Sequence, residues 1–159
     1  MKRALFSFLF VVAAAVAFSA SAFAQRNVTP AVERDPVLEA DAKHNLEVAR
    51  NAFLLKKAYK GVLMRFEETF AAYPDFSKMD EFLYYAGMSS YYLAEGKGKQ
   101  KIDLRTEKDK AKYAPEKLRE DAIAYLSMLI DKYPQSKYLD EAQKALGEIK
   151  QKAASSQTN

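Results

Sequence analysis

The feature that most constrains this chain is a Tyr-Pro dipeptide that recurs 60 residues apart in matching surroundings. Its two copies are Tyr73-Pro74 and Tyr133-Pro134. The same offset relates Phe66 to Leu126, Phe70 to Ile130, Asp80-Glu81 to Asp140-Glu141, and Gly87 to Gly147. Self-similarity of this kind is typical of solenoids, in which each helical unit buries its apolar face against the next. The sequence therefore predicts a stack of repeated helical units.

Apolar residues at spacings of three and four surround both dipeptides, which predicts amphipathic helices. Asp35-Pro36 has the form of an N-cap followed by proline at the first helical position. Ser77 and Asp80 have the spacing of a capping box ahead of the third helix. The predicted helices cover about 36–56, 58–73, 77–94, 115–133 and 136–153. No segment alternates with period two over a useful length, so we expect an all-α fold.

The apolar positions also carry a specific resemblance. Leu46, Ala49, Phe53, Val62, Phe66 and Pro74 have the spacing of the large, small and aromatic residues of the tetratricopeptide repeat. A second unit uses Leu83, Ala86 and Gly87, and then Ala122, Leu126 and Pro134. The sequence thus resembles tetratricopeptide-repeat proteins over roughly 40–150. This resemblance implies an α-solenoid of about five antiparallel helices, or two and a half repeats, with the fifth helix as a cap.

One branch of that family is more similar than the rest. The segment from Phe66 to Tyr92 resembles the BamD-type component of the outer-membrane β-barrel assembly machinery and its periplasmic relatives. The resemblance implies a protein that binds other proteins of the cell envelope. Such family members are normally lipoproteins with about five repeats, whereas this chain has no cysteine. We therefore expect a shortened periplasmic relative.

The N-terminal segment predicts export. Lys2 and Arg3 precede an apolar stretch, and Ala22-Phe23-Ala24 supplies a small-x-small cleavage site, so residues 1–24 have the pattern of a cleaved signal peptide. An uncleaved anchor is the alternative, although the apolar run is shorter than the ~20 residues of a spanning helix. We predict an N-terminal extension over 25–35, the helical domain over 36–153 and a disordered tail over 154–159. The expected location is the periplasm, peripheral to the outer membrane, with neither a lipid nor a membrane span.

The sequence contains no recognisable catalytic, cofactor or metal motif. His44 is the only histidine, and without cysteine or clustered carboxylates it predicts a helix-surface residue. Gly96-Lys97-Gly98-Lys99 lacks the spacing of a phosphate-binding loop. Of 25 basic residues, Lys2 and Arg3 fall in the signal, which leaves 23 against 21 acidic residues. That balance is too even to indicate a nucleic-acid partner. Because no catalytic, cofactor or metal motif is recognisable either, we predict that the protein is not an enzyme and binds no cofactor.

Residues 95–114 are rich in lysine and poor in apolar residues, which predicts a solvated loop. Between Glu95 and Lys117 there are eight basic and five acidic residues. Contact with an anionic membrane surface is the alternative. The modest excess of positive charge favours the solvated loop.

The third predicted helix is apolar on two faces. At 100° per residue, Leu83, Ala86, Ser90 and Leu93 share one face, and Tyr84, Tyr85, Met88, Tyr91 and Tyr92 share the other. The first face suits packing within the stack. The second is the side that lines the concave groove in the repeat family. We predict a partner-binding groove there, with Asn51 and Leu55 of the first helix added to it. The alternative is that the 95–114 loop or the first helix covers the tyrosines.

These observations predict a periplasmic helical stack that docks a protein or peptide segment of a cell-envelope complex. The first hypothesis is a BamD-like accessory of outer-membrane protein assembly. The second is a structural scaffold of another envelope complex, such as the Tol-Pal or peptidoglycan system.

Overall fold

The structure is a computed structural model that describes residues 34–100, 102 and 104–156. The predicted signal peptide over 1–24 and nearly all of the extension over 25–35 lie outside the described residues. The elements are α2 (Pro36–Asn51), the π-helix η2 (Ala52–Lys56), α3 (Tyr59–Ala72), α4 (Met79–Ala94), α5 (Glu107–Tyr113), α6 (Pro115–Lys132) and α7 (Leu139–Ser156). The part of the chain that the structure describes contains helices and no strand, which confirms the all-α prediction.

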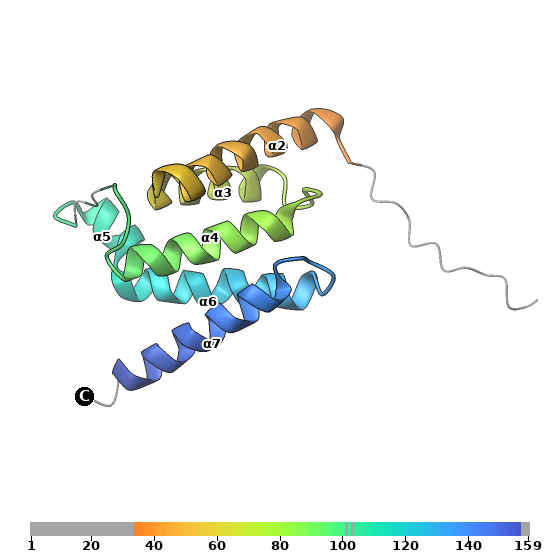
Figure 1. Ribbon diagram of the computed structural model, residues 1–159. Helices are drawn as coiled ribbons and strands as arrows, with labels where there is room; N and C mark the ends of the chain where they lie inside the picture. Colours follow the sequence, from red (N-terminus) through yellow and green to blue (C-terminus); the bar gives the residue numbers. More distant parts are fainter. Residues whose placement is uncertain (1–33, 101, 103, 157–159) are drawn as a thin grey trace, which may run out of the picture. The chain divides into compact units, whose positions relative to one another are not determined.

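The helices form a stack in which neighbours in sequence are neighbours in space (Figure 1). Contacts join α2 to α3, α3 to α4, α4 to α6, and α6 to α7. The chain reverses direction at each of these steps, so α2, α4 and α7 run the same way (Figure 1). Further contacts join α4 to α2 on one side and to α7 on the other. This arrangement confirms a tetratricopeptide-like α-solenoid, with α4 at its centre.

The turns after the two Tyr-Pro dipeptides have the same hydrogen bonds. The amides of Phe76 and Met79 donate to the carbonyls of Tyr73 and Phe76, at 3.3 and 3.1 Å. Sixty residues later, the amides of Ser136 and Leu139 donate to the carbonyls of Tyr133 and Ser136, at 2.9 and 3.1 Å. The repeat found in the sequence is therefore a repeat of backbone structure.

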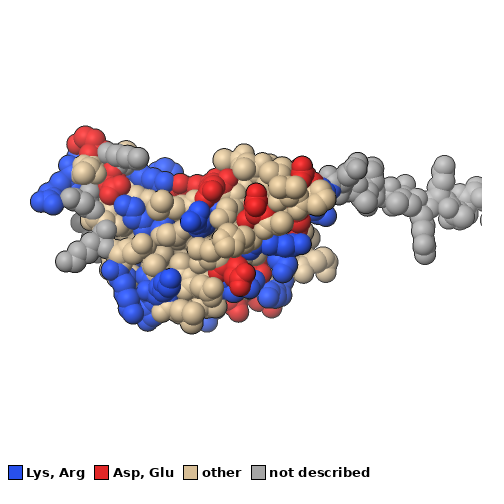
Figure 2. All heavy atoms as spheres, turned by 90° about the horizontal axis from the view of Figure 1, so that it is seen from above, with Lys and Arg blue, Asp and Glu red and all other residues tan. Residues whose placement is uncertain are grey.

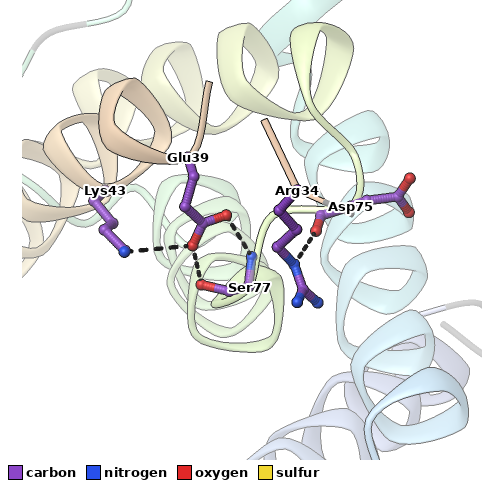
Figure 3. Close-up of polar contacts among 5 residues, drawn as sticks. All are labelled: Arg34, Glu39, Lys43, Asp75 and Ser77. Carbon is purple, nitrogen blue, oxygen red and sulfur yellow. Dashed lines mark hydrogen bonds and ion pairs between the residues drawn. The ribbon is translucent and has the colours of Figure 1, made fainter. Parts of the chain in front are cut away.

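The capping box predicted for Ser77 and Asp80 is wrong. α4 begins at Met79 and has no side-chain N-cap. The amide and hydroxyl of Ser77 both donate to the Glu39 carboxylate instead (Figure 3). Glu39 reaches this turn from the first helical turn of α2, and Lys43 lies 3.6 Å from the same carboxylate. Partial burial opposes the charge on Glu39, but the bonds from Ser77 and the nearby Lys43 hold its pKa below the usual value.

The contact between Glu39 and Ser77 has an equivalent in the second turn. The hydroxyl of Ser136, which precedes α7, donates to the carboxylate of Asp80 in the first turn of α4 at 2.6 Å. In both cases an acidic side chain near a helix N-terminus ties that helix to the turn of the next unit. At the first turn, Arg34 adds a bond from its Nε to the carbonyl of Asp75 (Figure 3).

The predicted loop over 95–114 is wrong in part, because it contains the helix α5. Thr106 caps this helix by accepting a hydrogen bond from the amide of Asp109 at 3.2 Å. Lys60 of α3 pairs with Asp109 at 3.1 Å, and Tyr113 at the end of α5 is buried. The predicted disordered tail over 154–159 also starts too early, since α7 continues to Ser156.

The core of the stack is centred on Phe66 of α3, which is 1% exposed. Its ring lies 4.8 Å from the ring of Tyr125 in α6 and 5.6 Å from the ring of Phe82 in α4, both edge to face. This side chain therefore joins three helices through aromatic contacts.

Candidate functional site

The predicted tyrosine face lies on α4, between η2 on one side and α7 on the other. Tyr84, Met88 and Tyr92 are half-buried and spaced four residues apart, so they form one line along the helix. We call these three residues the α4 stripe. Tyr85 and Tyr91 flank this line and are buried, with 5% and 6% exposure. The structure therefore divides the predicted face into an accessible stripe and two buried edges.

Phe53 of η2 covers the first edge. Its ring centroid lies 5.0 Å from that of Tyr85 and 5.9 Å from that of Tyr92. Tyr59, at the start of α3, lies 5.1 Å from Tyr92. From the sequence, Phe53 was expected only at an aromatic position of the repeat, and its contact with α4 was not predicted. Because η2 ends the first helix, the alternative that the first helix covers the tyrosines is correct for Tyr85.

The second edge is formed by residues of α7 and of the turn before it, which sequence reasoning missed. The ring of Tyr84 stacks on that of Tyr138 at 4.6 Å. The hydroxyl of Tyr84 donates to the Glu141 carboxylate at 2.6 Å. Near the other end of α4, Lys152 donates to the hydroxyl of Tyr91 at 2.8 Å. Lys152 of α7 therefore contacts Tyr91. The alternative that the 95–114 loop covers the tyrosines is correct in part for Tyr92, because Lys97 lies over its ring at 5.3 Å.

A polar contact also joins α2 to α4. The Nε and Nη2 atoms of Arg50 donate to one oxygen of the Glu81 carboxylate, at 2.8 and 2.5 Å. The Glu81 side chain is only 7% exposed, so its charge needs this partner. The bond to Glu81 raises the pKa of Arg50, against the effect of burial. Arg50 occupies a position where the repeat family usually has glycine, and here it is used to join adjacent repeats.

Two tyrosines of this region, Tyr84 and Tyr138, have a raised pKa. Burial raises the pKa of Tyr84, and its bond to the Glu141 carboxylate raises it further, because that bond requires the phenol proton. Burial also raises the pKa of Tyr138, with added effects from Tyr85 and Glu81. The phenols of Tyr84 and Tyr138 therefore stay protonated at neutral pH, and contacts from both sides hold the aromatic surface in place.

The two remaining predicted groove residues lie away from these ring contacts. Asn51 is exposed at the end of α2, and Leu55 is 73% exposed in η2. The structure brings Phe53, which lies between them in sequence, against α4. Their membership of the groove therefore stays a prediction.

Within residues 34–156, as far as they are described, no group of three or more His, Cys, Asp or Glu side chains is arranged to hold a metal ion. His44 is exposed on α2. None of the described helices is both long enough and apolar enough to cross a membrane.

A match to a known protein family shows which family the chain belongs to. The family of outer membrane lipoproteins named YfiO matches residues 19–159. No curated protein and no solved structure matches the sequence. The family match includes the whole described helical stack and confirms the BamD-type resemblance noted for the segment from Phe66 to Tyr92. The chain therefore belongs to the YfiO family of outer membrane lipoproteins, whose BamD-type members share its tetratricopeptide-like fold.

Proposed function

We propose that this chain is a non-enzymatic periplasmic scaffold that binds a protein segment on the α4 stripe and acts as a BamD-like accessory in outer-membrane β-barrel assembly. Membership of the YfiO family supports the cellular role. The observation that carries the binding role is the partial exposure of Tyr84, Met88 and Tyr92 along the centre of the stack. Asn51, exposed at the end of α2, extends the surface in this proposal.

The stripe has the composition of a binding surface. Tyrosine and methionine are enriched where protein interfaces are buried, and they supply large contact areas. Tyr84 is fixed by Tyr138 and Glu141, and Tyr92 is fixed by Phe53 and Tyr59. Side chains that are already fixed lose little conformational entropy when a partner binds. We therefore expect the stripe to bind without rearrangement of the stack.

Met88 is the best position for a direct test, because Tyr84 and Tyr92 also stabilise the fold. A photo-cross-linking amino acid in place of Met88 should form adducts in living cells with a β-barrel precursor or with a component of the assembly machinery. Met64 provides the matched control, since it is a methionine on α3 with 56% exposure. Identical adducts at both positions, or none at Met88, would exclude the stripe as the binding surface.

A depletion strain tests the cellular role. Loss of the protein should lower the amounts of outer-membrane barrels if the proposal is correct. Normal barrel levels with defective division or envelope integrity would instead support the scaffold of a Tol-Pal or peptidoglycan complex.

We also propose that the exported form begins at Gln25 and carries no lipid. The Ala22-Phe23-Ala24 pattern and the absence of cysteine from the sequence support this. The intact mass of protein purified from the periplasm tests it. A mass that retains residues 1–24, or that includes an acyl chain, would contradict this part of the proposal.

A further inference from the structure

The η2 end of the stack exposes two adjacent leucines beside several lysines. Leu54 is 56% exposed and Leu55 is 73% exposed, both within the single turn of η2. Lys56 and Lys57 follow them, and both are exposed. Large apolar side chains that are exposed together within a basic surface are typical of proteins that bind at an interface.

A second segment adds charge at the same place. The amide of Lys99 donates to the carbonyl of Lys57 at 3.0 Å, which holds the loop after α4 against the end of η2. The side chain of Gln100 accepts a hydrogen bond from the amide of Gly61 at 3.0 Å. Gly98 has a φ of 114° and lies so close to Tyr59 that a Cβ would be 2.9 Å from its ring. This loop is therefore packed in place, with Lys97 and Lys99 exposed.

We define the basic tip as Leu54, Leu55, Lys56, Lys57, Lys97 and Lys99. Among the described residues, no carboxylate lies within ion-pairing distance of its four lysines. Two acidic residues of this region have other ion-pair partners, since Asp109 pairs with Lys60 and Glu95 pairs with Lys152. Lys97 also lowers the pKa of Glu95, but less than Lys152 does. Figure 2 shows clusters of basic side chains at the end of the domain that carries α5. This end can therefore attract an anionic surface.

We propose that the basic tip docks on the surface of a membrane that contains anionic phospholipid. The lysines would lie at the headgroups while Leu54 and Leu55 enter the boundary of the acyl chains. Charge complementarity favours lipid as the occupant, because a lysine near an anionic bilayer adds about fivefold in affinity, or ~1 kcal/mol. This inference gives Leu55 a role other than the groove lining predicted from the sequence. The basic tip shares no residue with the α4 stripe, although Lys97 lies over the ring of Tyr92 at 5.3 Å. The leucine variants below therefore test this proposal separately from the α4 stripe.

Fluorescence provides a direct test, because the sequence has no tryptophan. Leu55→Trp introduces a single reporter at the tip, and Met64→Trp introduces one at an exposed site on α3. Vesicles of phosphatidylglycerol mixed with phosphatidylcholine should shift the emission of Leu55→Trp to shorter wavelength and leave that of Met64→Trp unchanged. Vesicles of phosphatidylcholine alone should shift neither. A shift at both sites, or at neither, would overturn the proposal.

Vesicle flotation of the exported protein measures how much the leucines and the lysines of the basic tip each contribute to membrane binding. Leu54→Asp with Leu55→Asp should weaken binding to the anionic vesicles by at least about tenfold. Val37→Asp with Met64→Asp makes the same change at two exposed sites outside the tip and should have no effect. Lys97→Gln with Lys99→Gln should weaken binding by roughly 25-fold at low salt. All variants share one N-terminus, fixed by intact mass, so residues before the domain cannot cause a difference between them. Unchanged binding by both tip variants, or equal binding to neutral vesicles, would overturn the proposal.

Discussion

Gly87 of α4 faces Leu126 of α6 so closely that a Cβ on the glycine would lie 2.7 Å from Cγ of the leucine. α4 and α6 can therefore approach each other only because residue 87 has no side chain. Gly147, 60 residues later in α7, has no atom within 4 Å of the equivalent position. The two glycines match in sequence, but only the first is required by packing.

This difference predicts opposite effects of the same substitution. Gly87→Ala should lower the free energy of unfolding by about 1–3 kcal/mol, because the added methyl group forces α4 and α6 apart. Gly147→Ala should raise it by about 0.5–1 kcal/mol, since alanine favours an exposed helix interior over glycine. Urea denaturation followed by circular dichroism measures both. Equal effects in the two variants would show that α4 and α6 do not pack as described.

Phe66→Ala should destabilise the domain by about 3–5 kcal/mol, because it removes a side chain that is 1% exposed and contacts rings on α4 and α6. A loss of this size is a large part of the stability of a small domain, so the variant is expected to be partly unfolded at physiological temperature. Lys99→Ala is the control. Its side chain is exposed, so its melting temperature should match that of the unmodified protein. Similar melting temperatures for the two variants would contradict the position of Phe66 in the core.

The hydrogen bond between Tyr84 and Glu141 should contribute to the docking of α7 on α4. A double-mutant cycle of Tyr84→Phe and Glu141→Gln should give a coupling energy of about 1 kcal/mol, since the acceptor is charged but the site is partly open to water. Arg65 and Glu68 provide a control pair at 2.9 Å on the exposed face of α3, where we expect about 0.3 kcal/mol. Coupling at Tyr84 no larger than at the control pair would mean that α7 is not held by this contact.

Alkaline pH should destabilise the fold through its half-buried phenols. Burial raises the pKa of Tyr125 to about 12, and the nearby carboxylates of Asp121 and Glu67 contribute to the rise. An unfolded tyrosine has a pKa of about 10. Because the folded value is the higher one, the stabilisation is complete below about pH 10 and is lost as the pH rises from there to about 12. The free energy of unfolding should therefore decline over this range.

Tyr125→Phe removes the contribution of this one phenol to the decline in the free energy of unfolding. Its stability at about pH 8 should be close to that of the unmodified protein, and its decline above about pH 10 should be shallower. The decline will not vanish, because burial also raises the pKa of Tyr84 and Tyr138. Urea titrations at several pH values measure this difference. Parallel curves for the two proteins would contradict the assignment to Tyr125.

The main helices could be predicted from the sequence because their boundaries depend on local chemistry. Asp35 caps α2, as its position before Pro36 predicts, and accepts from the amides of Val37 and Leu38. The α5 helix was missed because seven residues of mostly lysine and acidic side chains have too little apolar periodicity to indicate a helix. η2 was missed because a widened helical turn has no simple sequence pattern.

For the candidate site, the sequence predicted which residues share a face of α4 but not which residues of other helices contact them. The periodicity of an α-helix predicts that Tyr85 and Tyr91 lie beside the α4 stripe, and their positions around the axis of α4 agree with this. Their burial comes from Phe53 on η2 and from Lys152 on α7, which is 61 residues away from Tyr91 in sequence. Polar partners such as Glu141 and Lys152 have no periodic pattern that links them to a distant helix. Those contacts form only where the fold brings η2 and α7 against α4.

The central position of α4 also has a consequence for the order in which the domain opens. Every other long helix of the described stack touches α4, so α4 can exchange its amide hydrogens freely only when the surrounding packing is lost. α2 and α7 each have contacts on fewer sides and can fray while the centre remains folded. The backbone of α4 thus stays helical during the local unfolding that affects the ends of a solenoid, whereas the contacts that fix Tyr84 are lost when α7 frays.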